Sequence, residues 1–99
     1  MSLFINKNPL KGLSDEEMFN KLNSEKGYIE ILQYQLNNGV SVHNNNDYCI
    51  QYACDKGYYD CVQFLINNKA NIHVNDDYCF KVCKKNNNLD ILKLLEENA

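Results

Sequence analysis

The chain has 99 residues, 44% of them hydrophobic, and a formal net charge of -3 at pH 7. Such a length gives one small domain, and such a hydrophobic content excludes a chain that is disordered by composition. The weak, dispersed charge argues against a basic surface for nucleic acid. Residues 1–9 lack the apolar core of a signal peptide, and no run approaches the roughly 20 apolar residues that span a bilayer. We therefore expect a cytoplasmic protein.

The first predicted helix covers residues 15–22 and opens with a capping box, because Ser14 is followed at the third position by Glu17. Gly27 is expected to stop a helix in the left-handed conformation that favours glycine. Charged residues dominate this first helix, as expected of a repeat at the end of an array.

The next unit predicts two short helices joined by a tight turn. Asp47 has the chemistry of an N-cap residue, and Gly57 is placed to end the first of these helices. A second, mostly apolar helix is predicted from about Asp60. The first helix is expected to bury a stripe of residues at helical spacing, namely Tyr48, Cys49, Tyr52 and Ala53.

The same unit returns thirty residues later, since residues 46–49 (Asn-Asp-Tyr-Cys) are matched by residues 76–79 (Asp-Asp-Tyr-Cys). Asn87 takes the place of Gly57, and asparagine is the next-best residue for a left-handed position. A fixed period of roughly 20–50 residues indicates stacked repeats, and helices this short need stacking to be stable. We expect a partly disordered N-terminal extension over residues 1–13 and one repeat domain over residues 14–99. The domain would consist of an N-terminal capping repeat (14–39), a central repeat (40–69) and a C-terminal repeat (70–99).

This pattern resembles the ankyrin repeat. The matching segments are Ala53-Cys54, Lys56-Gly57-Tyr58, Cys61-Val62-Gln63-Phe64-Leu65 and Lys69-Ala70-Asn71-Ile72-His73. The resemblance implies an all-α solenoid of three helix-turn-helix repeats with short loops. The Thr-Pro-Leu-His opening of the family is absent and the unit is shorter, which puts regular β-hairpin loops in doubt. Both departures are similar to the ankyrin repeats of giant DNA viruses of amoebae, and the arginine-free, asparagine-rich composition fits an AT-rich genome.

Ankyrin-type stacks bind partners through their loop tips and the concave face of their first helices. The resemblance therefore implies a non-catalytic protein-protein interaction module that binds a protein, in a host cell if the source is viral, but neither nucleic acid nor membrane. The chain is expected to be a monomer or to self-associate weakly. Transferred by position, the candidate contact residues are Asn44, Asn45, Asn46, Asp55, Lys56, Tyr58, Asn75, Asp76, Lys84 and Lys85. Tyr58 is expected to be exposed at its turn, with Tyr59, whereas Tyr48, Tyr52 and Tyr78 are expected in the core.

No catalytic, metal or cofactor site is expected. His43 and His73 occupy equivalent places about one repeat apart, so they do not converge on one ion. The five cysteines lie in apolar stretches, and Cys79 and Cys83 follow the repeat, which favours a role as small hydrophobic residues in a reducing compartment. Two alternatives stay open: a fragment or structural remnant of a longer array with no partner of its own, and an asparagine- and lysine-rich nucleic-acid binder.

Overall fold

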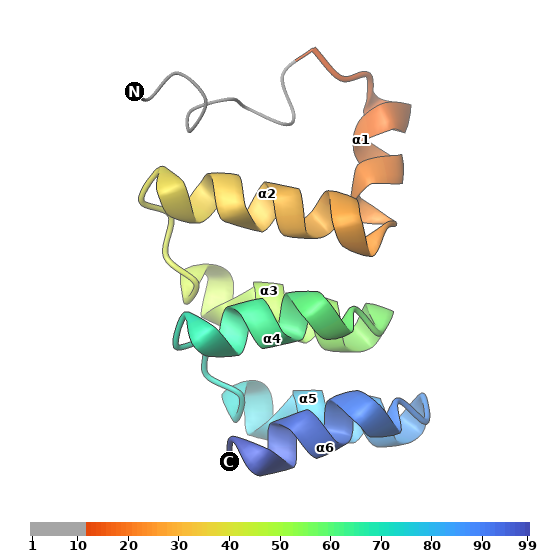
Figure 1. Cartoon of the computed structure of the whole chain (residues 1–99), viewed down its shortest axis with the longest axis vertical. Helices are drawn as coiled ribbons and strands as arrows, with labels where there is room; N and C mark the ends of the chain where they lie inside the picture. The colour runs from red at the N-terminus through yellow and green to blue at the C-terminus, as the bar shows by residue number, and fades with distance from the viewer. Residues whose placement is uncertain (1–11) are drawn as a thin grey trace. The chain divides into compact units, whose positions relative to one another are not determined.

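The computed structural model describes residues 12–99, so most of the predicted extension over residues 1–13 lies outside the described residues. Six helices and no strand form in the described range, which confirms the predicted all-α fold of helix-turn-helix repeats (Figure 1). The chain forms two compact units that divide after Ser41. The helices are α1 (Asp15–Leu22), α2 (Glu25–Asn37), α3 (Asn44–Lys56), α4 (Tyr59–Asn67), α5 (Val74–Lys85) and α6 (Leu89–Glu97).

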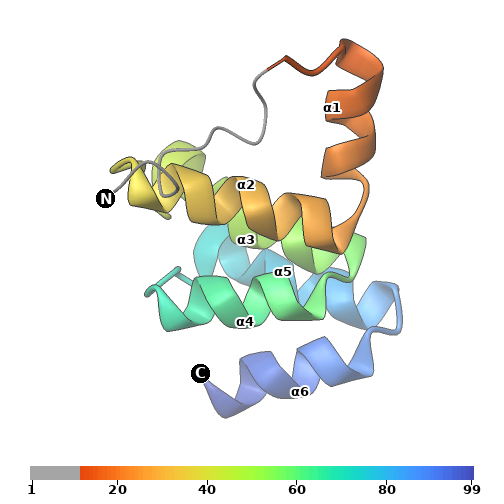
Figure 2. The same cartoon turned by 45° about the horizontal axis from the view of Figure 1, so that its top comes forward.

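The first unit holds α1 and α2, which pack on each other at a steep angle (Figure 2). The predicted capping box at the start of α1 is confirmed: the Glu17 amide donates to Ser14 Oγ over 3.2 Å, and the Ser14 amide donates to Glu17 Oε1 over 2.9 Å. The bond from the Ser14 amide also lowers the pKa of the Glu17 carboxyl. Lys21 Nζ and Glu30 Oε1 form an ion pair of 2.6 Å that links α1 to α2.

Gly27 has a different role from the predicted one. It lies buried in the first turn of α2, with a right-handed backbone, and does not end a helix, so that prediction is wrong. The Gly27 amide donates to Ser24 Oγ, and a Cβ atom here would collide with the Lys21 carbonyl oxygen and lie 2.7 Å from Ser24 Oγ. Glycine is required because the last turn of α1 comes so close to α2.

The second unit contains two helix-turn-helix repeats that pack side by side. In each repeat a first helix (α3 or α5) lies against a second helix (α4 or α6), and the two repeats meet through α3 with α5 and α4 with α6. Figure 1 shows α4 and α6 as a layer in front of α3 and α5. The second helix of the central repeat begins at Tyr59, next to the predicted start at Asp60. The largest fully buried side chains of this unit are Ile50, Cys54, Cys61, Val62, Leu65, Cys79, Cys83, Ile91 and Leu95.

Asparagine side chains close the second helices of all three repeats in the same way. The side-chain amide nitrogens of Asn38, Asn68 and Asn98 donate to carbonyl oxygens four residues earlier, over 2.8, 2.8 and 2.9 Å. The last carbonyls of a helix have no partner within the helix, so these bonds satisfy one of them at each end. Part of the asparagine content therefore has a structural function.

The turns between first and second helices follow the prediction. Gly57 has φ 76° and ends α3, and Asn87, its equivalent in the third repeat, has φ 60° after α5. Left-handed φ values are sterically costly for most residues but are tolerated by glycine and, less well, by asparagine.

Gly57→Val is expected to lower the free energy of unfolding by about 1–2 kcal/mol, because a β-branched residue is strained at this φ. Urea unfolding followed by circular dichroism measures the change. Gly57→Asn is the matched control, since asparagine already adopts this conformation at the equivalent position, and it should cost less. An equal loss in both variants would contradict this explanation of the turn.

Candidate functional site

Each of the two loop tips in the second unit is a turn of three consecutive residues with left-handed backbone angles. The φ values are 53°, 60° and 54° at Asn45, Asn46 and Asp47, and 55°, 57° and 62° at Asn75, Asp76 and Asp77. Only asparagine and aspartate, besides glycine, visit this region often, so the Asn-Asp runs suit the turn. The residue before α3 is His43, and Asp47, predicted as the N-cap, lies instead inside α3 as the last residue of this left-handed turn.

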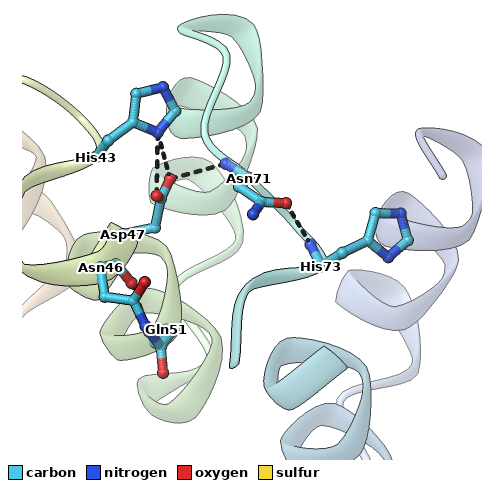
Figure 3. A network of polar contacts seen from close by, with 6 residues as sticks. All are labelled: His43, Asn46, Asp47, Gln51, Asn71 and His73. Carbon is cyan, nitrogen blue, oxygen red and sulfur yellow. Dashed lines mark hydrogen bonds and ion pairs between the residues drawn. The ribbon is translucent and has the colours of Figure 1, made fainter. Parts of the chain in front are cut away.

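The Asp47 carboxylate joins the two tips (Figure 3). Its oxygens lie 2.9 and 3.0 Å from His43 Nδ1, and Oδ2 accepts a 2.8 Å hydrogen bond from the backbone amide of Asn71 in the next repeat. The Asn71 side-chain oxygen in turn accepts from the His73 amide over 3.0 Å. Asp47 is the only buried charged residue in residues 12–99, and these bonds compensate its burial.

The third repeat repeats this arrangement in a more exposed setting. His73 Nδ1 lies 2.7 Å from Asp77 Oδ1, as His43 lies against Asp47. The Asp77 side chain is 53% exposed, however, whereas that of Asp47 is 8% exposed. The spacing of four residues between histidine and aspartate recurs in both repeats of the second unit, and this signal in the sequence could have predicted the pair.

Gln51 forms hydrogen bonds with both tips. Its amide nitrogen donates to the Asn46 carbonyl oxygen over 2.9 Å, and its amide oxygen accepts from Asn75 Nδ2 over 3.3 Å. Lys81 Nζ lies 3.1 Å from Asp76 Oδ2. The tip residues transferred from the family are therefore brought to one side of the second unit, where Asn44 and Asn45 are also exposed. Nothing in the sequence singles out Gln51.

An exposed aromatic surface lies on the first helices. Tyr48 is 54% exposed, so its predicted burial is wrong; its ring lies tilted against that of Tyr52, with centroids 6.0 Å apart and an interplanar angle of 33°. The reason is that α3 buries the side that carries Ile50, Ala53 and Cys54, and the tyrosines point away from it. Tyr52 and Tyr78 are half-buried, and Cys49, expected in the core stripe, is half-buried too.

Tyr78 and Asp55 belong to the same surface. Partial burial is the largest cause that raises the pKa of the Tyr52 and Tyr78 phenols, and the Asp55 carboxylate contributes in both cases. Tyr48 also lies within electrostatic reach of both rings. The phenols consequently stay neutral hydrogen-bond donors at physiological pH. We call the surface formed by Tyr48, Tyr52, Tyr78 and Asp55 the tyrosine face.

Tyr58 does not belong to the tyrosine face. It is only 8% exposed and packs edge-on against Tyr52, with ring centroids 6.3 Å apart and an interplanar angle of 71°. Its predicted exposure is wrong, because the ring turns inward over the core. Tyr59, its neighbour, is exposed as predicted.

The remaining candidates lie at the C-terminal ends of the first helices. Asp55 and Lys56 on α3, and Lys84 and Lys85 on α5, are all exposed. Lys56 Nζ lies 5.8 Å from the centroid of the Tyr52 ring, and Asn86 Nδ2 donates to the Asp55 carbonyl oxygen over 3.3 Å. The two helix ends are thereby brought next to each other and to the tyrosine face.

A family model described as ankyrin repeats (3 copies) matches residues 22–99. The chain belongs to the ankyrin-repeat family. No curated protein and no solved structure matches it. Ankyrin repeats generally mediate protein-protein interactions, and the family is typically non-enzymatic.

The described part of the chain, residues 12–99, contains neither a metal-binding cluster nor a helix able to cross a membrane. No group of three or more His, Cys, Asp or Glu side chains there is arranged to hold a metal ion. None of the six helices combines the length and the apolar character that a membrane crossing requires.

Asp47→Ala is expected to lower the free energy of unfolding of this ankyrin domain by about 2–3 kcal/mol, because it leaves the part-buried amide of Asn71 without its charged acceptor. Asp77→Ala removes the same side chain where it is exposed and should cost less than about 1 kcal/mol. Parallel urea titrations give both values. Equal losses would mean that the bond between the repeats contributes nothing.

Proposed function

We propose that this ankyrin domain is a protein-binding module whose partner contacts the tyrosine face and the loop tips beside it. The observation that carries the proposal is the exposure of Tyr48, whose ring lies against that of Tyr52. Tyrosine offers a large apolar area and a polar end at low cost in side-chain entropy, which is why it is enriched among the residues that dominate binding energy.

The surroundings of the tyrosine face supply directional contacts. Neutral phenols and the ammonium groups of Lys56 and Lys85 donate hydrogen bonds, and Asp55 accepts them. The tips add Asn44, Asn45, Asn46, Asn75 and Asp76. Gln51 bonds to Asn46 and Asn75, and Lys81 pairs with Asp76. A surface ordered before binding loses less entropy when the partner arrives, so fixed tips favour affinity. The charges on Lys84 and Lys85 lie at the edge of this surface, where they affect association rate more than affinity.

The proposal includes a viral source and a place of action in the host cell. The Asn-Asp-Tyr and Ala-Asn-Ile-His segments, the absence of arginine and the abundance of asparagine support a giant-virus origin. The partner is then a host protein, and the place of action is the host cytoplasm. Neither a catalytic step nor a cofactor forms part of the proposal.

A second candidate is a structural piece of a longer array that has no partner of its own. It is favoured by Phe80 and Leu92, which are half-buried although their equivalents, Ile50 and Val62, are fully buried. Lys84, however, is exposed at the position equivalent to the buried Cys54, so charge and apolar area mix on this side of the third repeat. A purely structural role does not explain why the tyrosine face is exposed.

Tyr48→Ala is expected to weaken binding of the partner at least tenfold, which corresponds to about 1.4 kcal/mol. Partners are captured from host lysate with the intact chain, identified by mass spectrometry, purified and titrated against each variant. Because Tyr48 is exposed, circular dichroism should show an unchanged fold and melting temperature.

The matched control is Tyr59→Ala, which removes an exposed tyrosine outside the tyrosine face and should leave the affinity unchanged. A captured protein that binds both variants as tightly as the intact chain would rule out the tyrosine face. Failure to capture any protein that distinguishes the variants would favour the structural candidate.

A further inference from the structure

Helices α5 and α6 form the outer layer of the second unit, next to α3 and α4 (Figure 1). Two hydrogen bonds show which side of α3 meets this layer. The Asp47 carboxylate accepts the backbone amide of Asn71 over 2.8 Å, and the Ile50 carbonyl oxygen accepts the Cys79 thiol over 3.8 Å. The residues thirty positions after Asp47 and Ile50 therefore lie on the side of α5 that faces away from α3.

We call this side of the third repeat the open face. The central repeat has buried residues at the equivalent positions, whereas two residues of the open face are exposed and two are half-buried. The open face consists of Asp77 and Lys84, which are exposed, and Phe80 and Leu92, which are half-buried; their equivalents are Asp47, Cys54, Ile50 and Val62. The Phe80 ring stacks on that of His73, with centroids 5.5 Å apart and an interplanar angle of 14°.

The two charges of the open face lie at opposite ends of α5. Asp77 Oδ1 contacts His73 Nδ1, but within residues 12–99 the Asp77 carboxylate accepts no bond equivalent to the one from Asn71 to Asp47. In the same range Lys84 forms no ion pair, and Lys81, which lies between the two charges, is paired with Asp76. Seven residues separate Asp77 from Lys84, which is about 10 Å along a helix.

The charge pattern points to a second copy of this chain: we propose that the open faces of two chains pack on each other as a dimer with two-fold symmetry. Helix α5 lies antiparallel to α5 of the other copy. Asp77 of each chain then lies beside Lys84 of the other, so the same ion pair forms twice. Phe80, between the two pairs, packs close to Phe80 of the other copy.

The lysine at position 84 favours this occupant over another repeat stacked as the third repeat is stacked on the central one. In that stacking, position 54 of α3 holds a cysteine without any exposed surface. A lysine at the equivalent position would be buried without a charged partner, which is costly. In the antiparallel dimer each Lys84 ammonium meets a carboxylate.

The dimer is expected to be weak, because each copy contributes one side of a 12-residue and a 9-residue helix. Contacts of this small size are typical of transient association, so we expect a dissociation constant between about 10 µM and 1 mM at low salt. Tyr48 and Tyr52 lie on α3, outside this contact. The dimer would thus present two tyrosine faces, and its test requires no other partner.

The test measures the dissociation constant of the full chain by sedimentation equilibrium at low salt. Asp77→Lys and Lys84→Glu each place like charges together in both pairs, so each variant alone should dimerise at least about tenfold more weakly. An equimolar mixture of the two variants should recover the dimer, because each pair in the mixed dimer again joins a lysine to an acid. Only an antiparallel contact between positions 77 and 84 predicts this recovery.

Lys56→Glu is the matched control, since it makes the same charge change in the last turn of α3, outside the open face, and should leave the dissociation constant unchanged. Lysine tolerates the backbone at position 77, as Lys69 with φ 73° shows, and circular dichroism checks the fold. If Asp77→Lys does not fold, Asp77→Asn, which suits this φ and removes the charge, should still weaken the dimer. A chain that stays monomeric up to about 1 mM, a dimer that Lys84→Glu leaves unchanged, or a mixture of folded variants that does not recover it would each overturn the proposal.

Discussion

Each helix of this protein is too short to be stable alone, so its stability depends on burial against a neighbouring helix. In the second unit that burial is concentrated between α3 and α5, where Ile50 and Cys54 meet Cys79 and Cys83. The loop tips add a polar bond at one end of the same contact, from the Asn71 amide to the Asp47 carboxylate. Apolar packing holds the two repeats together, and this bond fixes their register.

The same contact organises the candidate binding surface. Since α3 and α5 bury the sides that face each other and the second helices, the side that carries Tyr48, Tyr52 and Tyr78 is left outside. Gln51 extends from this surface to both tips and holds Asn46 and Asn75. A partner would therefore meet aromatic and polar groups whose positions follow from the packing of the core beneath them.

The repeat places the histidines and the cysteines at regular positions, but only the cysteines become buried between α3 and α5. His43 and His73 stand at equivalent positions of the repeat. Each contacts the aspartate four residues later, Asp47 or Asp77, and the two histidines do not converge. The cysteines behave differently, because Cys54 on α3 and Cys79 and Cys83 on α5 are all fully buried in two helices that pack on each other, although Cys54 and Cys83 are not equivalent positions of the repeat. A contact between non-equivalent positions cannot be read from the period alone.

The sequence by itself determined the repeat, the capping box at Ser14, the left-handed turns at Gly57 and Asn87 and the helices, because these depend on local backbone preference and periodicity. Only the tertiary structure decided which side of each helix is buried. It exposed Tyr48, turned Tyr58 inward, placed Gly27 where α1 approaches α2, and made Asp47 a link between repeats. These outcomes depend on contacts with residues far away in the sequence. When a helix packs on several sides, the spacing of its apolar residues does not show which side stays exposed to solvent.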